Sequence, residues 1–422
     1  MSQSGPVGGV SRSLRGATRS LRGRAGRYRL AAALAVLLAV ALIVVSAGRD
    51  GDGVPAGTVR AAQTLGPTEG ALSLVTWPGL VENGGSDERV NWVAPFEERT
   101  SCRVSIKQVS TAQELVDLMS NSDRRYDGAL APPEAAGRLI DTGHVAPVNP
   151  DLVDGYKRLE PRLRALLKRA DTVYGVPYVW GSNLLMYDQR AVQPAPTGWA
   201  DLFDPDRAQR YGGRLVMRDT PLALAEAALY LRSKRKSLDI TDPYALTREQ
   251  LDAAAKVVRE QRPYVKSYWT QPADAVSAFA GGEAAMGQVS SYQLDVLSRA
   301  GRPVAGVVPR EGVTGWANSW LVGARAEHPN CMYEWLKWTS SPDVQRQVAE
   351  WAGVAPANPQ ACEGDRLKSS FCATYQVGDD AYLKKVIFAR TPTRDCDGER
   401  RDECTDYAEW TRAWQEARGL TR

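Results

Sequence analysis

The sequence predicts an α/β protein of two lobes that follows one apolar segment at the N-terminus. Runs of β-type residues alternate with helix-type runs from about residue 70 onward, which is typical of a mostly parallel sheet covered by helices. The chain has 422 residues, 43% of them hydrophobic, and this is enough for two hydrophobic cores. The stretch "TVYGVPYVWGSNLLMYD" at 172–188 places a rigid aromatic arm beside a flexible Trp-Gly-Ser joint.

The first 48 residues read as an export signal or a membrane anchor. Seven arginines and no acidic residue precede the apolar run Leu30–Ala47. As a helix this run would span roughly 27 Å, close to the thickness of the hydrocarbon core. The flanking arginines would keep the N-terminus in the cytoplasm, so we expect a cytoplasmic segment at 1–29, a transmembrane or signal segment at 30–48 and a linker at 49–69.

Cleavage of this segment is left open by the sequence. Val45-Ser46-Ala47 would suit signal peptidase, but the apolar run exceeds the 7–15 residues usual in a signal peptide. We favour an uncleaved anchor in which residues 30–47 contact the lipid bilayer and the globular part lies outside the cell membrane. Secretion after cleavage is the alternative.

The net charge of the globular part argues against a nucleic-acid partner. Subtracting the seven N-terminal arginines from 53 basic residues leaves 46, against 49 acidic residues. The globular part is therefore slightly acidic and lacks the basic patch of a nucleic-acid-binding domain.

Six cysteines fit an oxidising compartment. An even count favours three disulfides, although six cysteines allow 15 connectivities. Pairing between neighbours in the chain is the most economical pattern, and would leave two distant cysteines to pair. A metal site is disfavoured, because the sequence has no C-x-x-C and only two, widely separated histidines; we expect neither a metal nor a cofactor. The economical pairs are Cys362–Cys372, Cys396–Cys404 and Cys102–Cys331.

The first lobe is expected to begin as a strand-helix-strand unit. Strands at 72–78, 102–109 and 126–131 alternate with helices around Phe96 and at 111–120. Ligands of such sheets collect at the carboxyl ends of the strands. Those ends are at Trp77-Pro78-Gly79-Leu80 and Ala131-Pro132-Pro133.

A second unit is expected after residue 182. A strand at 214–219 runs into Thr220-Pro221, a helix-start signal, and Thr247 with Gln250 forms a capping box. A further helix would end at Gly281-Gly282, followed by strands at 284–291 and 303–310. The chain would return to the first lobe near 312–323, and two helices, the second capped by Ser341, would follow.

These elements give the domain boundaries. Lobe 1 would comprise 70–181 and 317–353, and lobe 2 would comprise 182–316 and 354–422. Residues 172–188 would form a strand plus a crossover, with Trp180, Gly181 and Ser182 as a hinge that absorbs the backbone change of lobe closure. Two core strands with a glycine bulge are the alternative.

Five stretches in order carry a resemblance to a known family. "LSLVTWPGLVE", "YDGALA", "YGVPYVWGSNLLMYD", "YGGRLVMRDTPLALAEAAL" and "VVPREGVTGWANSWLVG" resemble the spermidine/putrescine-binding proteins. The resemblance covers about residues 70–360. It implies a type II periplasmic-binding-protein fold and the role of solute-binding subunit in an ABC importer. The cysteine-containing tail resembles that of actinobacterial members.

The resemblance also implies ligand-binding positions in the cleft between the lobes. Trp77 and Trp316 match family aromatics that lie against the ligand, and Asp219 stands in the family's acidic stretch. Several other positions depart from the family: Thr220 and Ala223 replace carboxylates, Asn318 replaces an aspartate, Ser290 a tryptophan and Leu80 a tyrosine. An ammonium group enters a cleft only if carboxylates and aromatic faces replace its water, so polyamine binding is expected to be weak.

Three classes of function follow. The first is a monomeric solute-binding subunit that takes a small molecule to membrane permease subunits. The second is a membrane-tethered sensing or binding module on the same fold. The third, an enzyme, is disfavoured because the sequence lacks G-x-S-x-G, H-E-x-x-H and a Walker loop.

Overall fold

The computed structural model describes residues 60–121, 123–364, 367–396 and 402–420. The described residues belong to one compact unit. The expected apolar segment 30–47 lies outside the described residues. Within the described ranges, no helix is both long enough and apolar enough to cross a membrane.

Twelve strands of the described residues form one mixed sheet. Its main path runs β2-β1-β3-β12-β7-β10-β8-β9. The pairs β1–β2 and β1–β3 are parallel in one lobe, and β8–β9 and β8–β10 are parallel in the other. Each lobe thus has the parallel sheet that the alternation of strands and helices predicts. The path strands are β1 (Ala71–Thr76), β2 (Arg103–Gln108), β3 (Gly128–Ala131), β7 (Val176–Asp188), β8 (Leu215–Arg218), β9 (Val265–Trp269), β10 (Met286–Ser290) and β12 (Val313–Gly323).

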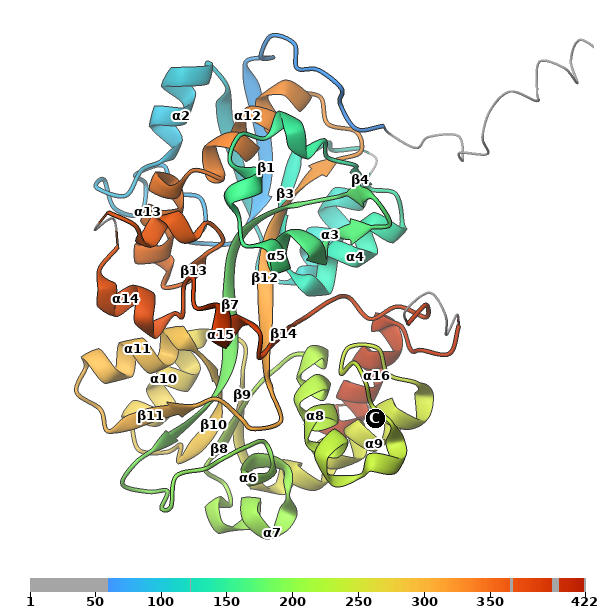
Figure 1. The fold of residues 1–422 in the computed structure, drawn as a ribbon, viewed down its shortest axis with the longest axis vertical. Helices are drawn as coiled ribbons and strands as arrows, with labels where there is room; N and C mark the ends of the chain where they lie inside the picture. The colour runs from blue at the N-terminus through green and yellow to red at the C-terminus, as the bar shows by residue number, and fades with distance from the viewer. Residues whose placement is uncertain (1–59, 122, 365–366, 397–401, 421–422) are drawn as a thin grey trace, which may run out of the picture. The chain divides into compact units, whose positions relative to one another are not determined.

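The long antiparallel strands β7 and β12 run through both lobes (Figure 1). Gly181 pairs with Trp316 and Trp180 with Ala317, and the register shifts between Asn318 and Ser319. The expected strand plus crossover at 172–188 is instead one uninterrupted strand from Val176, because β12 pairs with it on both sides of Gly181.

Helices cover the sheet of lobe 1. Thr111 and Ser341 cap two of them, each accepting a hydrogen bond from the backbone three residues later, as the sequence predicts for Ser341. The buried indoles of Trp320 and Trp335 meet edge to face, with centroids 5.7 Å apart. The helices are α2 (Val93–Thr100), α3 (Ala112–Ser120), α4 (Pro133–Asp141), α5 (Pro161–Leu166), α12 (Pro329–Thr339) and α13 (Pro342–Ala352).

Lobe 2 has its own helices and a separate hydrophobic cluster. Thr247 and Gln250 form the expected capping box. Thr220 caps a 3-10 turn, η4 (Pro221–Ala223), and the α-helix itself starts only at Leu224. The helices are α6 (Ala200–Phe203), α7 (Pro205–Ala208), α8 (Leu224–Lys234), α9 (Arg248–Gln261), α10 (Pro272–Ala280) and α11 (Ser291–Arg299), and the edge strand is β11 (Val304–Val307).

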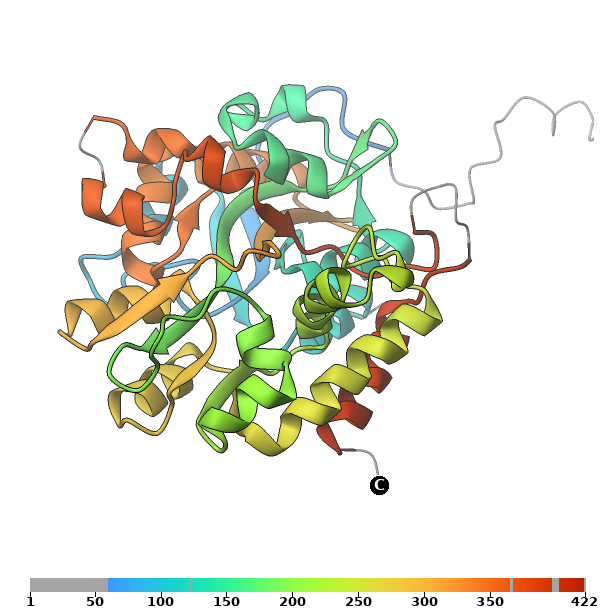
Figure 2. The ribbon, with the colours of Figure 1, turned by 60° about the horizontal axis from the view of Figure 1, so that its bottom comes forward.

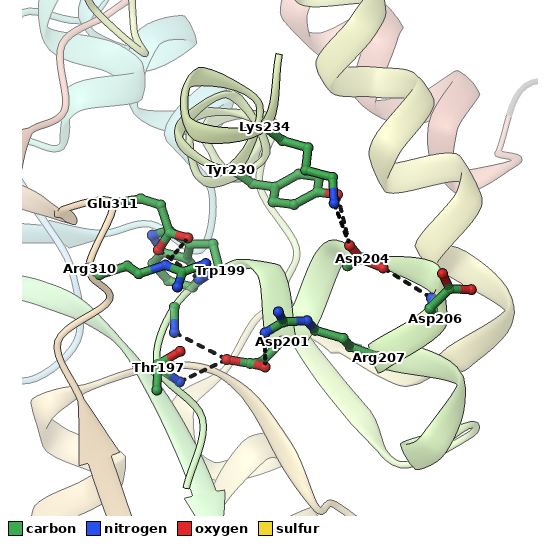
Figure 3. Close-up of polar contacts among 11 residues, drawn as sticks. Thr197, Trp199, Asp201, Asp204, Asp206, Arg207, Tyr230, Lys234, Arg310 and Glu311 are labelled. Carbon is green, nitrogen blue, oxygen red and sulfur yellow. Dashed lines mark hydrogen bonds and ion pairs between the residues drawn. The ribbon is translucent and has the colours of Figure 1, made fainter. Parts of the chain in front are cut away.

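A network of polar contacts fixes the loop before α6 against the start of β12 (Figure 3). The Asp201 carboxylate accepts from the backbone of Thr197 at 2.7 Å and from that of Gly198 at 3.2 Å. The Glu311 carboxylate accepts from the backbone of Trp199 at 3.1 Å. A side chain at Gly198 would collide with Glu311, since an added Cβ would lie 2.2 Å from its oxygen.

The chain after lobe 1 returns along strand β7 before it reaches lobe 2. Strand β13 (Ala355–Pro356) pairs with β7 beside Trp180, and α14 (Ser369–Thr374) and α15 (Asp380–Leu383) follow. The residue-level lobe boundaries drawn from the sequence stay a prediction.

The C-terminal arm, residues 386–396 and 402–418, touches both lobes. Its strand β14 (Val386–Phe388) pairs with the first residues of β12, and the Gly137 backbone of α4 donates to Thr391 Oγ1 at 2.9 Å. The Thr405 backbone donates to Leu246 O in lobe 2 at 2.9 Å. Helix α16 (Tyr407–Arg418) ends the arm and lies along α9 (Figure 2).

The structure contains three disulfides, which confirms their expected presence. The pairs are Cys102–Cys331, Cys362–Cys372 and Cys396–Cys404, the most economical pattern in the sequence. The first links two segments of lobe 1 that are 229 residues apart.

Candidate functional site

A cavity of about 640 Å³ lies between the two lobes. It is at the carboxyl ends of β1, β2 and β3 on one side and of β8, β9 and β10 on the other, where ligands of open α/β sheets collect. All five candidate ligand residues line its wall: Trp77, Asp219, Ser290, Trp316 and Asn318. The structure thus brings together residues that are far apart in sequence, and their role in ligand binding stays a prediction.

Three tryptophans give the cavity flat apolar walls. The Trp77 indole donates to Leu130 O at 3.0 Å, and that of Trp269 donates to Gln288 O at 2.9 Å. The Trp316 ring lies against the backbone of Gly181, where an added Cβ would come within 2.7 Å of a ring carbon. Backbone contacts therefore fix the orientation of these rings.

Asp219 is already engaged by the C-terminal arm. Its Oδ1 accepts from Trp414 Nε1 at 2.9 Å and forms an ion pair with Arg418. The Arg418 guanidinium lies 3.5 Å from the centroid of the Tyr268 ring. The carboxylate expected to attract a cationic ligand thus has a cation from its own chain.

The other two polar candidates differ in their freedom to contact a ligand. Ser290 is the N-cap of α11 and forms a capping box with Gln293. The Asn318 side chain is largely buried, and the described residues offer it no hydrogen bond. Its amide is therefore open to the cavity, whereas Ser290 has a structural role as well.

Four charged or aromatic residues of the wall were not singled out from the sequence: Glu134, Arg138, Arg218 and Tyr407. The Glu134 carboxylate accepts from Thr220 Oγ1 at 3.3 Å and lies 3.9 Å from the Arg218 guanidinium, so these contacts join the lobes. The sequence contained a signal for one of them: Arg218 directly precedes Asp219 at the end of a predicted strand, where cavity residues are expected.

A buried carboxyl group lies behind Asn183, which is part of the cavity wall. Glu226 Oε1 accepts from Gln288 at 2.8 Å and from Asn183 at 3.2 Å, and Thr314 donates to the same oxygen. Its Oε2 has no partner within the described part of the chain. Burial raises the pKa of the Glu226 carboxyl, and the hydrogen bond from Thr314 lowers it by a smaller amount, so that the pKa is about 7.

Two of the three candidate hinge residues, Trp180 and Ser182, contact the segment that follows lobe 1. Trp180 Nε1 donates to Pro356 O at 3.0 Å, and the Tyr382 hydroxyl donates to Ser182 Oγ at 2.6 Å. Gly181 packs under Trp316. These contacts connect the crossing strands to the cavity wall, and hinge bending at 180–182 stays a prediction.

Comparison with known families identifies the class of protein. The model for bacterial extracellular solute-binding proteins matches residues 91–370. The chain belongs to this family. This match confirms the resemblance to solute-binding proteins that is seen in the sequence. It also supports the expectation that the globular part is an extracytoplasmic solute-binding domain.

Curated relatives of this solute-binding protein are polyamine-binding proteins by name. The spermidine/putrescine-binding periplasmic protein of Escherichia coli K12 is 25% identical over 283 residues, covering 67% of this chain and 74% of the relative. The putrescine/agmatine-binding protein of Pseudomonas aeruginosa is 24% identical over 297 residues, covering 64% of this chain and 78% of the relative.

Solved structures show the same two-lobed α/β fold. A spermidine/putrescine ABC transporter substrate-binding protein from Streptococcus pneumoniae aligns with a TM-score of 0.62 at 15% identity, covering 82% of this chain and 99% of the other. A putative spermidine/putrescine ABC transporter from Listeria monocytogenes aligns with a TM-score of 0.64 at 16% identity, covering 83% of this chain and 100% of the other. The matched family and the curated relatives are solute-binding proteins, which agrees with the expectation that the chain is not an enzyme.

Proposed function

We propose that this solute-binding protein captures a small molecule in the interlobe cavity and presents it to the permease subunits of an ABC importer. The observation that carries the proposal is the cavity itself, whose walls come from both lobes at the strand ends. Trp77 and Trp316 would flank the solute, and Asn318, Asp219 and Ser290 would contribute polar contacts.

The solute differs from the polyamines for which the relatives are named. A desolvated ammonium group needs a carboxylate partner or aromatic faces. Position 318 offers a neutral amide, and Asp219 is neutralised by Arg418. The cleft therefore favours a neutral or singly charged solute over putrescine or spermidine.

Membrane attachment is part of the proposal. The arginine-rich flank and the apolar run 30–47 would hold the protein at the outer face of the cell membrane, near the permease. Fractionation tests this: full-length protein should be found in membranes, with its C-terminus accessible to protease from outside. A mature form beginning near Gly48 in the medium would contradict anchoring.

A thermal-shift screen tests the binding function. Polyamines, amino acids and small organic anions are added to the purified protein, since a ligand at 100 times its dissociation constant adds about 2.7 kcal/mol of stability. We expect a shift with a non-polyamine solute, lost in Trp316→Ala and kept in Trp351→Ala, which removes an exposed indole outside the cavity wall. A solute that binds both variants equally would contradict this site.

A further inference from the structure

Two arginines from opposite lobes line the cavity. Arg138 is on α4 of lobe 1, and Arg218 ends β8 of lobe 2. The Arg138 guanidinium donates to the neutral Gln113 amide at 2.9 Å. The Arg218 guanidinium has its nearest carboxylate, Glu134, at 3.9 Å, which is longer than a charge-assisted hydrogen bond. Both side chains thus keep donors that another carboxylate could use.

The side chain of Tyr407, in the C-terminal arm, lies close to both arginines and to Glu134. The Arg138 guanidinium lies 5.7 Å from the centroid of the Tyr407 ring. Burial raises the pKa of the Tyr407 hydroxyl, Glu134 raises it further, and Arg138 and Arg218 lower it. All three charged groups are therefore within electrostatic range of the same hydroxyl, and their charges sum to +1.

We infer that this end of the cavity is a carboxylate-binding site and that the solute is a small monocarboxylate. The inference rests on the proposed function and narrows its ligand class. A guanidinium presents a planar fork of donors that matches a carboxylate, and the local charge of +1 would be neutralised by one such group. Because one arginine belongs to each lobe, the anion would also hold the lobes together.

The rest of the cavity suits the body of such a solute. The indoles of Trp77, Trp269 and Trp316 line it, and aromatic faces pack against aliphatic chains or hydroxylated carbon skeletons. The Asn318 amide could donate to or accept from a hydroxyl group. A diamine would bring two positive charges to a wall that already carries one in excess.

The C-terminal arm completes this site. Tyr407 and Thr411 line the cavity, and both lie beyond residue 370, where the family match ends. Tyr407 is a positioning residue, since its ring lies under the Arg138 guanidinium and a cation–π contact restricts where that group can point. Specificity for a carboxylate would thus depend on a segment outside the matched region.

Four-carbon probes that differ only in their ends test the inference. Melting temperatures of the full chain are compared with 4-hydroxybutyrate, succinate, 1,4-butanediol and putrescine at equal millimolar concentration and ionic strength. We expect 4-hydroxybutyrate to protect more than the diol or the diamine. Arg138→Gln and Arg218→Gln should each weaken its binding at least about 30-fold. Arg210→Gln is the matched control, because it removes the same charge from an exposed position of lobe 2 outside the cavity.

Variants of Tyr407 separate positioning from folding. Tyr407→Phe keeps an aromatic face under Arg138 and should keep carboxylate binding, whereas Tyr407→Leu should lose this binding. Without ligand, the two variants should have similar melting temperatures. Equal or better protection by succinate, the diol or putrescine, no protection by 4-hydroxybutyrate, or unchanged binding in both arginine variants would overturn the inference. The solute screen with Trp316→Ala decides the proposed function separately, since it does not depend on the charge of the ligand.

Discussion

Arg418 neutralises Asp219 from within the same chain, although the two residues are 199 positions apart. The guanidinium is held between that carboxylate and the face of Tyr268. Its side chain is only 13% exposed, so the pair is partly desolvated and removal of one partner leaves the other without its counter-charge. The last turn of α16 thereby neutralises the one negative charge that Asp219 would bring to the cleft, in addition to packing on lobe 2.

Replacing Arg418 by methionine should destabilise the protein by about 1–3 kcal/mol. The substitution keeps an apolar stem near Tyr268 but leaves Asp219 with only the Trp414 hydrogen bond. Urea unfolding measures the effect. Arg259→Met is the matched control on the exposed face of α9, where no loss is expected. Equal stability of wild type and Arg418→Met would show that the ion pair contributes nothing.

Restoring a carboxylate at position 318 should create polyamine affinity. An unpaired ammonium in the cleft lacks a partner worth about 2–5 kcal/mol when desolvated, so the wild type should bind putrescine poorly or not at all. Asn318→Asp should bind it at least tenfold more tightly, and the double variant with Arg418→Met more tightly still, because Asp219 is then released. Calorimetry on all three proteins measures this.

Two results would contradict this assignment of the cleft. One is tight putrescine binding by the wild type, and the other is no gain from Asn318→Asp. Ala223, which the resemblance would also place at a carboxylate position, is a poor place for such a test: it is 1% exposed and is not part of the cavity wall. A glutamate there would have to be buried in lobe 2.

The disulfide between Cys102 and Cys331 should contribute most to stability. In the loop-entropy model, closing its 229-residue separation is worth about 5 kcal/mol, against about 3 kcal/mol for the 10-residue separation of Cys362 and Cys372. Double alanine variants compared by melting temperature should follow that order. The unreduced, denatured wild type should show no thiol labelling, and labelling at more than one site would refute the pairing.

Local signals in the sequence predicted much of the fold. Period-two apolar runs place β1 and β2, and cap residues place the start of α9 and α13. The carboxyl ends of these strands then locate the cleft and its tryptophans. The final helix was not predicted, although its signals are present: Asp406 with Glu409 forms a capping box, and Trp410 and Trp414 are one turn apart.

The charges of the site could not be assigned from the sequence. Arg138 and Arg218 look like many other surface arginines, and only the packing of one lobe against the other turns them toward the same cavity. Likewise, nothing near Asp219 in the chain indicates that Arg418 will neutralise it. Such long-range pairs depend on the path of the C-terminal arm, which the local pattern does not specify.

Gly181→Ala should disturb the cavity through Trp316. The added methyl group would lie 2.7 Å from a ring carbon, so the indole or the strand must move, at a cost of about 1–3 kcal/mol. We expect a changed tryptophan emission spectrum and roughly tenfold weaker solute binding, the factor that corresponds to about 1.4 kcal/mol. Gly66→Ala is the control, since its Cβ would make only ordinary contacts with Asn330. A Gly181→Ala protein with unchanged emission and affinity would contradict this packing.

Glu226 should make the stability of the protein fall as the pH rises. Burial raises the pKa of its carboxyl from 4.5 to about 7 in the folded state. Between these two values the folded protein holds a proton that the unfolded chain has lost, so unfolding becomes easier with increasing pH. The loss is complete above about pH 7 and amounts to roughly 3 kcal/mol, at 1.36 kcal/mol per pKa unit.

Glu226→Gln isolates this effect. The amide oxygen can accept the hydrogen bonds that Asn183, Gln288 and Thr314 donate to Oε1, and the amide nitrogen takes the place of the unpartnered Oε2. The variant carries no ionisable group there, so its stability relative to the wild type should increase between pH 5 and pH 8 by up to roughly 3 kcal/mol. Urea unfolding at both pH values measures the difference, with the exposed Glu249→Gln on α9 as control. A constant difference between Glu226→Gln and the wild type across this range would mean that Glu226 is already ionised at pH 5 in the folded protein.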